Sequence, residues 1–143
     1  MKILVIDGQG GRMGRAVVEQ LKARFPQREI IALGTNSIAT STMLKAGADQ
    51  GATGENPVLV NAPEADLIIG PIGIVVANAL LGEVTPAMAA AVGAAPAQKI
   101  LIPSSRCNLH VAGVAPLSLS ELVSAAVEEA SRFFAEGDAS SSL

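Results

Sequence analysis

Apolar residues fall into short runs of strand length, and these runs alternate with stretches that have helical spacing. The runs predict a first strand that ends at Asp7 and later strands at residues 29–33, 51–53, 67–70, 99–103 and 109–114. The stretches between them predict helices at residues 11–25, 38–46, 57–63, 72–81, 86–95 and 118–137. This alternation predicts an α/β fold: a doubly wound, mostly parallel Rossmann-like sheet with helices on both faces, in three α/β/α layers and with strand order 3-2-1-4-5-6.

One apolar run, at residues 58–60, has strand propensity but is assigned to a helix. Only residues 61–66 separate it from the next strand, and a parallel crossover needs about a dozen residues. Asn56 can cap a helix that has Pro57 at its first position. The third strand is therefore expected at residues 51–53.

The last helix sets the expected limit of the folded domain. It begins with the capping box Ser118-x-x-Glu121 and continues with an apolar stripe of helical spacing. Gly137 is expected to end it. Residues 1–137 are thus predicted to form a single Rossmann-like nucleotide-binding domain, and residues 138–143 a disordered tail.

Composition narrows the class of protein. Half of the 143 residues are apolar, but the chain has three Phe and neither Trp nor Tyr, so its core must be aliphatic, as in a parallel sheet under helices. The single cysteine excludes an internal disulfide and, with no secretory signal at the start of the chain, favours a cytoplasmic location. The apolar run at residues 67–81 is too short for a membrane span and is interrupted by Gly and Pro, so no membrane is expected as a partner.

Charge is distributed unevenly, although the net charge is only −3. Residues 1–28 carry six basic and two acidic side chains, whereas residues 115–143 carry one basic and five acidic side chains. The basic end of the chain coincides with a glycine-rich turn. Lys and Arg do not cluster with aromatic residues, so nucleic acid is not expected as a partner.

The glycine-rich turn follows the first strand directly and leads into the first helix. Its glycines fit G-x-G-x-x-x-G and G-x-x-G-x-x-G, and neither pattern is the strict dinucleotide fingerprint. A strand–glycine–helix junction lets backbone N–H groups at the helix start face an anion; alternatively, the glycines serve only a tight turn with positive φ. We expect the turn to hold a small phosphate-bearing ligand through the cofactor-binding candidates Gly8, Gln9, Gly10, Gly11, Arg12, Met13 and Gly14.

Further candidates lie where other predicted strands end. The carboxyl ends of parallel strands meet at one edge of the sheet, and α/β proteins bind ligands there. The segments at that edge, besides the glycine turn, are residues 34–37, 53–56, 70–73 and 104–108, and they are polar or glycine-rich. They add the cofactor-binding candidates Gly34, Thr35, Asn36, Ser37, Gly70, Pro71 and Ile72.

The residues at the end of the second strand indicate which nucleotide is expected to bind. An NAD site places an acid there, on the adenosine ribose, but this sequence has Gly34-Thr35-Asn36. NAD is therefore not favoured, and the polar residues from Thr35 to Ser37 would bind a 2′-phosphate without charge assistance. Arg12 either supplies the missing charge or is a solvated residue of the first helical turn. The expected cofactor is NADP or NAD.

No residue pattern establishes catalysis, so the catalytic residues stay unassigned. Arg106 precedes Cys107, and a cation beside a thiol favours the reactive thiolate, but a lone cysteine is more often a core residue. His110, the only histidine, is expected to be exposed or on an edge strand. Asp7 either contacts a ligand or caps the turn. The sequence has no Ser/His/Asp arrangement and no zinc motif, so no metal is expected.

Two family resemblances rest on these residues. The glycine turn is similar to the nucleotide-binding turn of dihydrodipicolinate reductase, G-x-x-G-R-M-G-R, which implies that the pyrophosphate and adenosine of a cofactor contact Gly8, Gly11, Arg12 and Met13. That family's histidine and lysine motif, and its acid after the second strand, are absent from this sequence. The segments VIDGQGG, IALGTNSIATSTMLKAGAD, GATGEN and DLIIGPIGIVVANALLGEVTP resemble an uncharacterised family of small bacterial proteins, known only as a domain of unknown function. This second resemblance implies a Rossmann-like fold and no particular activity.

Three functions are open at this point. The first is a stand-alone nucleotide-binding protein that holds a dinucleotide or another phosphate ligand at the glycine turn. The second is an NADP-dependent reductase whose site is completed by a neighbouring subunit. The third is a non-catalytic nucleotide sensor or scaffold.

The apolar middle of the chain predicts self-association. Residues 67–98 contain a single charged side chain, Glu83, and the predicted helices at 72–81 and 86–95 are apolar on nearly every side. A surface helix of a monomer normally shows a polar face, so a homo-oligomer that contacts itself through residues 72–95 is expected. The alternative is an alanine-rich surface that has no partner.

Overall fold

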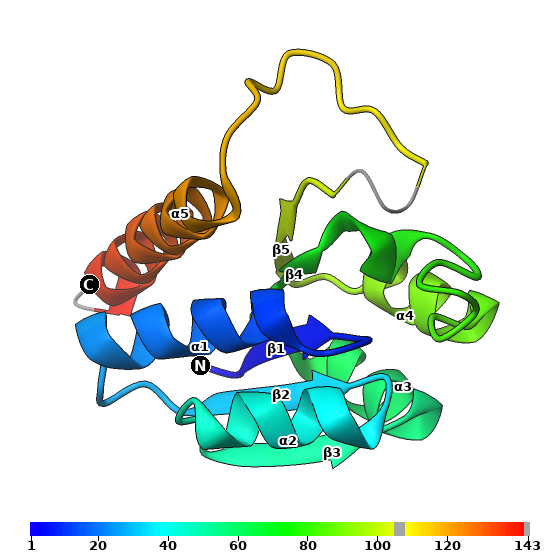
Figure 1. Cartoon of the computed structure of the whole chain (residues 1–143). Coiled ribbons are helices and arrows are strands. Elements are labelled where there is room, and N and C mark those ends of the chain that lie inside the picture. Colours follow the sequence, from blue (N-terminus) through cyan, green and yellow to red (C-terminus); the bar gives the residue numbers. More distant parts are fainter. Residues whose placement is uncertain (105–107, 142–143) are drawn as a thin grey trace.

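The computed structural model describes residues 1–104 and 108–141, which form a five-stranded parallel sheet flanked by helices (Figure 1). Strand β1 (Ile3–Asp7) lies at the centre between β2 (Ile30–Gly34) and β4 (Leu67–Pro71). Strands β3 (Gln50–Thr53) and β5 (Gln98–Ile102) form the two edges. The order β3-β2-β1-β4-β5 and the parallel pairing confirm the predicted doubly wound, Rossmann-like α/β sheet.

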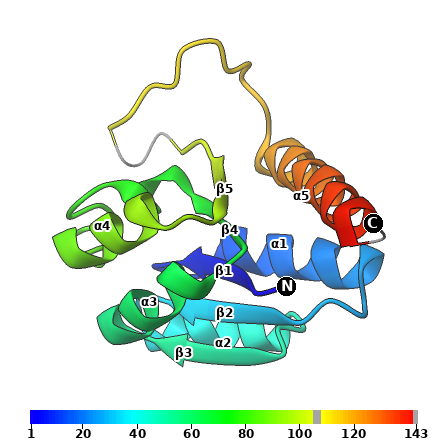
Figure 2. The same cartoon turned by 180° about the vertical axis from the view of Figure 1, so that it is seen from behind.

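Helices cover both faces of this sheet, which gives the predicted three layers. One face packs against α1 (Arg12–Arg24), α2 (Ser37–Lys45) and α5 (Leu119–Ser141). The other face packs against α3 (Glu55–Asn61), α4 (Pro86–Ala94) and the short 3-10 helices η1 (Ala62–Glu64) and η2 (Ile72–Val75), as Figure 2 shows from behind. None of the helices in the described ranges is both long and apolar enough to cross a membrane.

The central strand divides its side chains between two apolar cores. All five residues of β1 are buried. Ile3 and Val5 point into the core beneath α1, whereas Leu4 and Ile6 point into the core beneath α3 and α4, as the alternation of a strand requires. A strand buried on both faces is apolar along most of its length, which explains why residues 3–6 and β4 read as continuous apolar runs.

The apolar run at residues 58–60 is helical, as the crossover argument predicted. It belongs to α3, where Val58 is buried against α4 and the sheet. The helix begins earlier than expected, because Gly54 and not Asn56 is its N-cap residue. Local strand propensity is therefore overridden by the chain length that a parallel connection requires.

Helix α5 begins at the predicted capping box but extends beyond its predicted end. Ser118 and Glu121 exchange backbone-to-side-chain hydrogen bonds of 3.1 and 3.2 Å. The helix continues through Gly137 to Ser141, so residues 138–141 are helical and the prediction of a disordered tail was wrong for them; residues 142–143 lie outside the described residues. Arg28 forms an ion pair with Asp138, and this contact favours the helical conformation of the segment expected to be disordered.

The predicted helix at residues 72–81 is absent. Only a 3-10 helix, η2, forms there, and a chain of turns follows it. Asn78, Leu80 and Leu81 have left-handed φ angles of 56–64°, and Gly82 has φ of 89°. An α-helix at residues 72–81 cannot contain the first three of these residues, so the tertiary contacts of this segment, described below, override its helical propensity.

The predicted sixth strand at residues 109–114 is also absent. Residues 108–118 form an irregular, exposed connection from β5 to α5, which we call the arch (Figure 1). Strand propensity depends on cross-strand packing, and the apolar side chains of the arch line a pocket instead of pairing with β5. The sheet therefore ends at β5.

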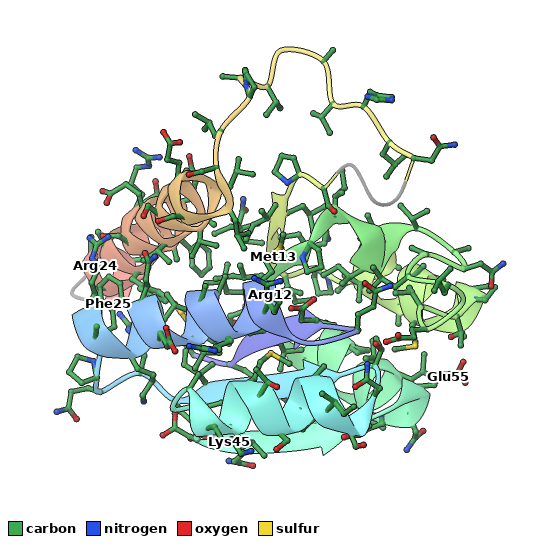
Figure 3. The ribbon with its side chains drawn as sticks, viewed as in Figure 1. Arg12, Met13, Arg24, Phe25, Lys45 and Glu55 are labelled. Carbon is green, nitrogen blue, oxygen red and sulfur yellow. The ribbon has the colours of Figure 1, made fainter. Side chains whose placement is uncertain are left out.

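The packing of α5 generates a prediction about stability. Phe134 is buried, its ring lies 4.9 Å from that of Phe25 in a T-shaped arrangement, and the Arg28 guanidinium lies 4.5 Å above it (Figure 3 shows Phe25 beside α5). Phe134→Ala should lower the free energy of unfolding by about 3–5 kcal/mol, measured by urea denaturation. Ala125→Glu, on the exposed face of the same helix, should change it by no more than about 0.5 kcal/mol. Equal effects of the two substitutions would show that α5 is not anchored at Phe134.

Candidate functional site

The candidate site is a pocket of about 760 Å³ at the carboxyl edge of the sheet. Its floor is the turn between β1 and α1, and Figure 3 shows Arg12 and Met13 there at the start of α1. Its other walls come from the end of β4, from Leu80 and from the start of α5. The arch lies over the opening, so segments that are distant in the sequence enclose one space.

The pocket brings together some of the predicted binding residues and leaves others outside. The glycine-turn candidates that line it are Gly8, Gln9, Gly10, Gly11, Arg12 and Met13, and Pro71 lines it from β4. Gly14 is buried beneath the turn. The predicted residues outside its lining are Gly14, Gly34, Thr35, Asn36, Ser37, Gly70 and Ile72. The pocket therefore lies on the β4 and β5 side of the turn, away from the end of β2.

Asp7 caps the turn from inside, which answers the choice that the sequence left open. Its carboxylate accepts hydrogen bonds from the backbone N–H groups of Gly8, at 2.8 Å, and Gly14, at 2.7 Å. Burial raises the pKa of Asp7 more than these hydrogen bonds lower it, and the nearby charge of Glu83 raises it further. Asp7 thus fixes the path of the chain from β1 into α1, and it also lines the pocket.

Two glycines of the turn are required by the fold itself. Gly11, the N-cap of α1, has φ of 72°, and a Cβ atom there would lie 2.9 Å from the backbone Cα of Ala39. A Cβ on Gly8 would overlap the Thr35 hydroxyl and lie 3.0 Å from the Glu83 carboxylate. A Cβ atom at Gly10, in contrast, would meet only the Arg12 side chain among the described residues, 3.9 Å away. Gly10 is therefore the position where a substitution tests a ligand without disturbing the packing.

The outer side of the turn keeps hydrogen-bond donors available. The backbone N–H groups of Gly10 and Arg12 donate to no acceptor among the described residues. The Arg12 side chain is exposed and forms no ion pair within the described ranges. Both residues line the pocket, so two N–H groups and a guanidinium are placed at its floor.

Sequence reasoning missed a residue that joins three segments at this edge, Glu83. One carboxylate oxygen, Oε1, accepts three hydrogen bonds: from the Gln9 backbone N–H at 2.9 Å, from the Thr35 hydroxyl at 2.6 Å and from the Asn36 amide at 2.8 Å. The Asn36 amide also donates to the Gln9 carbonyl at 2.9 Å. Glu83 is the single charge in an apolar stretch of the sequence, and that isolation was the signal that could have identified it.

The hydrogen bonds of Glu83 decide its protonation state. Partial burial raises the pKa of the carboxyl group, but the donors from Thr35, Gln9 and Asn36 together outweigh burial and hold the pKa below its ordinary value. Glu83 is therefore ionised at neutral pH. It holds the segment after β4 against the glycine turn and the end of β2 by charge-assisted hydrogen bonds.

The structure describes only some of the other residues that the sequence singled out. His110 is exposed on the arch and lines the pocket, in agreement with the expectation of an exposed position. Ser105, Arg106 and Cys107 lie outside the described residues. Across residues 1–104 and 108–141, no group of His, Cys, Asp or Glu side chains is arranged to hold a metal ion.

The lowered pKa of Glu83 predicts a pH dependence of stability. A carboxyl whose pKa is lower in the folded state stabilises the protein fully above its unfolded pKa of about 4.5, and this contribution is lost as the pH falls through the folded pKa. The free energy of unfolding of the wild type should exceed that of Glu83→Gln at neutral pH, and the difference should shrink below about pH 4.5.

Urea unfolding at a series of pH values measures this difference. Glu136→Gln, which removes an exposed carboxylate from α5, is the matched control and should show no such trend. A difference between wild type and Glu83→Gln that is the same at every pH would show that the contacts of Glu83 do not depend on its charge.

Comparison with known proteins places the chain in a family. No curated protein and no solved structure matches it. Residues 2–135 match the model of a family described as a domain of unknown function (DUF3842). Because this match covers nearly all of the 143 residues, the resemblance to an uncharacterised family is confirmed, and the chain belongs to the DUF3842 family.

Proposed function

We propose that this protein binds a nucleotide or a related phosphate-bearing ligand in the pocket above the glycine turn. The observation that carries the proposal is the pocket floor, where the N–H groups of Gly10 and Arg12 and the Arg12 guanidinium are available to an anion. These groups stand at the N-terminus of a helix of 13 residues, whose dipole favours negative charge. A phosphate supplies both the charge and several acceptor oxygens.

The walls of the pocket favour a ligand that also has an apolar or planar part. The side chains that enclose the space above the turn are mostly aliphatic: Leu80, Leu109, Val111, Val114, Leu117 and Leu122. Small-molecule sites commonly combine such walls with a few polar groups that orient the ligand, and about 760 Å³ lies within their usual size range. A base or nicotinamide ring joined to a phosphate meets both requirements, so a dinucleotide such as NAD or NADP is the proposed cofactor class.

Isothermal titration calorimetry against NAD(H), NADP(H), FAD, ATP and coenzyme A tests the proposal. At least one of these should bind, and Gly10→Val and Arg12→Ala should each weaken that binding by about tenfold or more, since each removes space or charge at the floor. Arg15→Ala, which changes an exposed arginine paired with Glu19, is the control and should bind as the wild type does. Absence of binding at millimolar ligand concentration would refute the proposal.

A second copy of the chain is the proposed partner of the α4 surface. The exposed residues of α4 are all small and apolar: Pro86, Ala87, Ala90, Gly93 and Ala94. Leu81, which precedes this helix in the sequence, is 96 % exposed. An exposed leucine of this kind in a left-handed backbone conformation is costly for a monomer. The proposed homo-oligomer contacts itself through this part of residues 72–95.

Light scattering at micromolar concentration tests this assembly. The wild type should have a mass of at least twice 14.4 kDa, and Ala90→Glu should reduce it, because a buried carboxylate would lie in the contact. Ala125→Glu makes the same change on the exposed face of α5 and should leave the mass unchanged. A wild-type mass near that of one chain would refute the interface.

A further inference from the structure

We propose that Glu83 binds the adenosine ribose of the ligand and selects a ribose that has no 2′-phosphate. This inference rests on the proposed function and adds the ligand preference of the site. In dinucleotide-binding sheets the acid that contacts the ribose follows the second strand, and this chain has Thr35 and Asn36 there. The structure brings an acid to that place from a different segment, the one between β4 and α4.

The position of the carboxylate fits this role. It contacts Gln9, directly after the first glycine of the turn, and both polar residues that follow β2. All three donors bind Oε1, whereas the second oxygen, Oε2, accepts no hydrogen bond from the described residues. Oε2 has lone pairs for ribose hydroxyls, and the bonds to Oε1 fix its orientation.

Backbone hydrogen bonds within the segment that carries Glu83 fix its position beside the glycine turn. Backbone hydrogen bonds close residues 78–84 into a compact loop: from Asn78 to the Val84 carbonyl at 2.7 Å, from Val84 to the Ala79 carbonyl at 3.1 Å, and from Glu83 to the Leu80 carbonyl at 3.1 Å. Its left-handed residues are sterically unfavourable, and such strain tends to persist at functional sites. Gly8 adds to this arrangement, because a Cβ there would collide with Thr35 and crowd Glu83.

An exposed apolar side chain lies close in the sequence to a residue that contacts the carboxylate. Ile38 is two residues beyond Asn36, which donates a hydrogen bond to Glu83, and Ile38 is 67 % exposed. This apolar surface is costly to leave in water. An adenine base attached to the ribose would cover apolar surface of this kind.

The negative charge around Glu83 disfavours a phosphate on the 2′ position of the ribose. Glu83 is ionised, and the buried Asp7 carboxyl is close enough for the Glu83 charge to raise its pKa. No cationic side chain is hydrogen-bonded to Glu83 among the described residues. A 2′-phosphate would face a carboxylate with no compensating cation, whereas a 2′-hydroxyl would donate a hydrogen bond to it. The proposal therefore differs from the expectation that Thr35, Asn36 and Ser37 hold a 2′-phosphate.

NAD⁺ and NADP⁺ differ only in the 2′-phosphate, so calorimetry with this pair tests the inference directly. The wild type should bind NAD⁺ at least tenfold more tightly than NADP⁺. Glu83→Gln keeps an oxygen that can accept the bonds now made to Oε1, and it should weaken NAD⁺ binding and reduce the ratio to about threefold or less. Glu136→Gln removes an equal charge from α5 and should keep the wild-type ratio.

The outcomes separate the inference from the proposed function. Equal or tighter binding of NADP⁺ by the wild type refutes the role of Glu83 but not the nucleotide site. Because this comparison uses the wild type alone, it does not depend on whether a variant folds. An unchanged ratio in Glu83→Gln refutes it as well. Binding of another phosphate ligand but of neither dinucleotide refutes the inference alone, and binding of no ligand refutes both.

Discussion

The contact between the Glu83 carboxylate and the glycine turn is the interaction on which the rest of the site depends. Three donors from two different segments converge on one of its oxygens. This joins the loops that follow β1, β2 and β4, which are the three central strands of the sheet. A charged acceptor of three hydrogen bonds in a partly buried place is a strong tertiary constraint on the segment between β4 and α4.

The two acids at this edge have different roles because their surroundings differ. Asp7 is buried and faces inward, where it satisfies backbone donors of Gly8 and Gly14 and shapes the turn. Glu83 approaches from outside, is held ionised by its donors and divides the edge into two regions. On one side lie Thr35 and Asn36, and on the other lies the pocket beneath the arch. At the floor of that pocket, Arg12 and the outer N–H groups of the turn are the groups that can attract an anion.

The sequence predicted those parts of the fold that depend on local pattern and chain connectivity. The five strands, the helical assignment of Val58 and the capping box at Ser118 follow from alternation, crossover length and side-chain capping, and the structure confirms them. The errors arose where distant contacts override local preference. Residues 72–81 read as a helix because their helical propensity was visible and the attachment of Glu83 to the turn was not.

The same limit applies to the candidate site. The glycine turn could be identified because its four glycines lie within residues 8–14, between a strand and a helix. The pocket above it could not, because residues 109–114 of the arch were predicted to be a strand and the contribution of the arch to the lining depends on where α5 begins. The absence of an acid after β2 was read correctly, but its replacement by Glu83 requires two segments that are far apart in the chain to meet. Such convergence is a property of the fold and not of any local motif.

Nuclear magnetic resonance of ¹⁵N-labelled protein during titration with NAD⁺ tests the central claim most directly, because it observes each backbone N–H group separately. The account predicts that the largest and saturable shift changes occur at the amides of Gly10 and Arg12, with accompanying changes at Gln9 and in the arch, while the amides of α4 change little. Saturable changes confined to other parts of the protein would place the ligand elsewhere and would contradict the account.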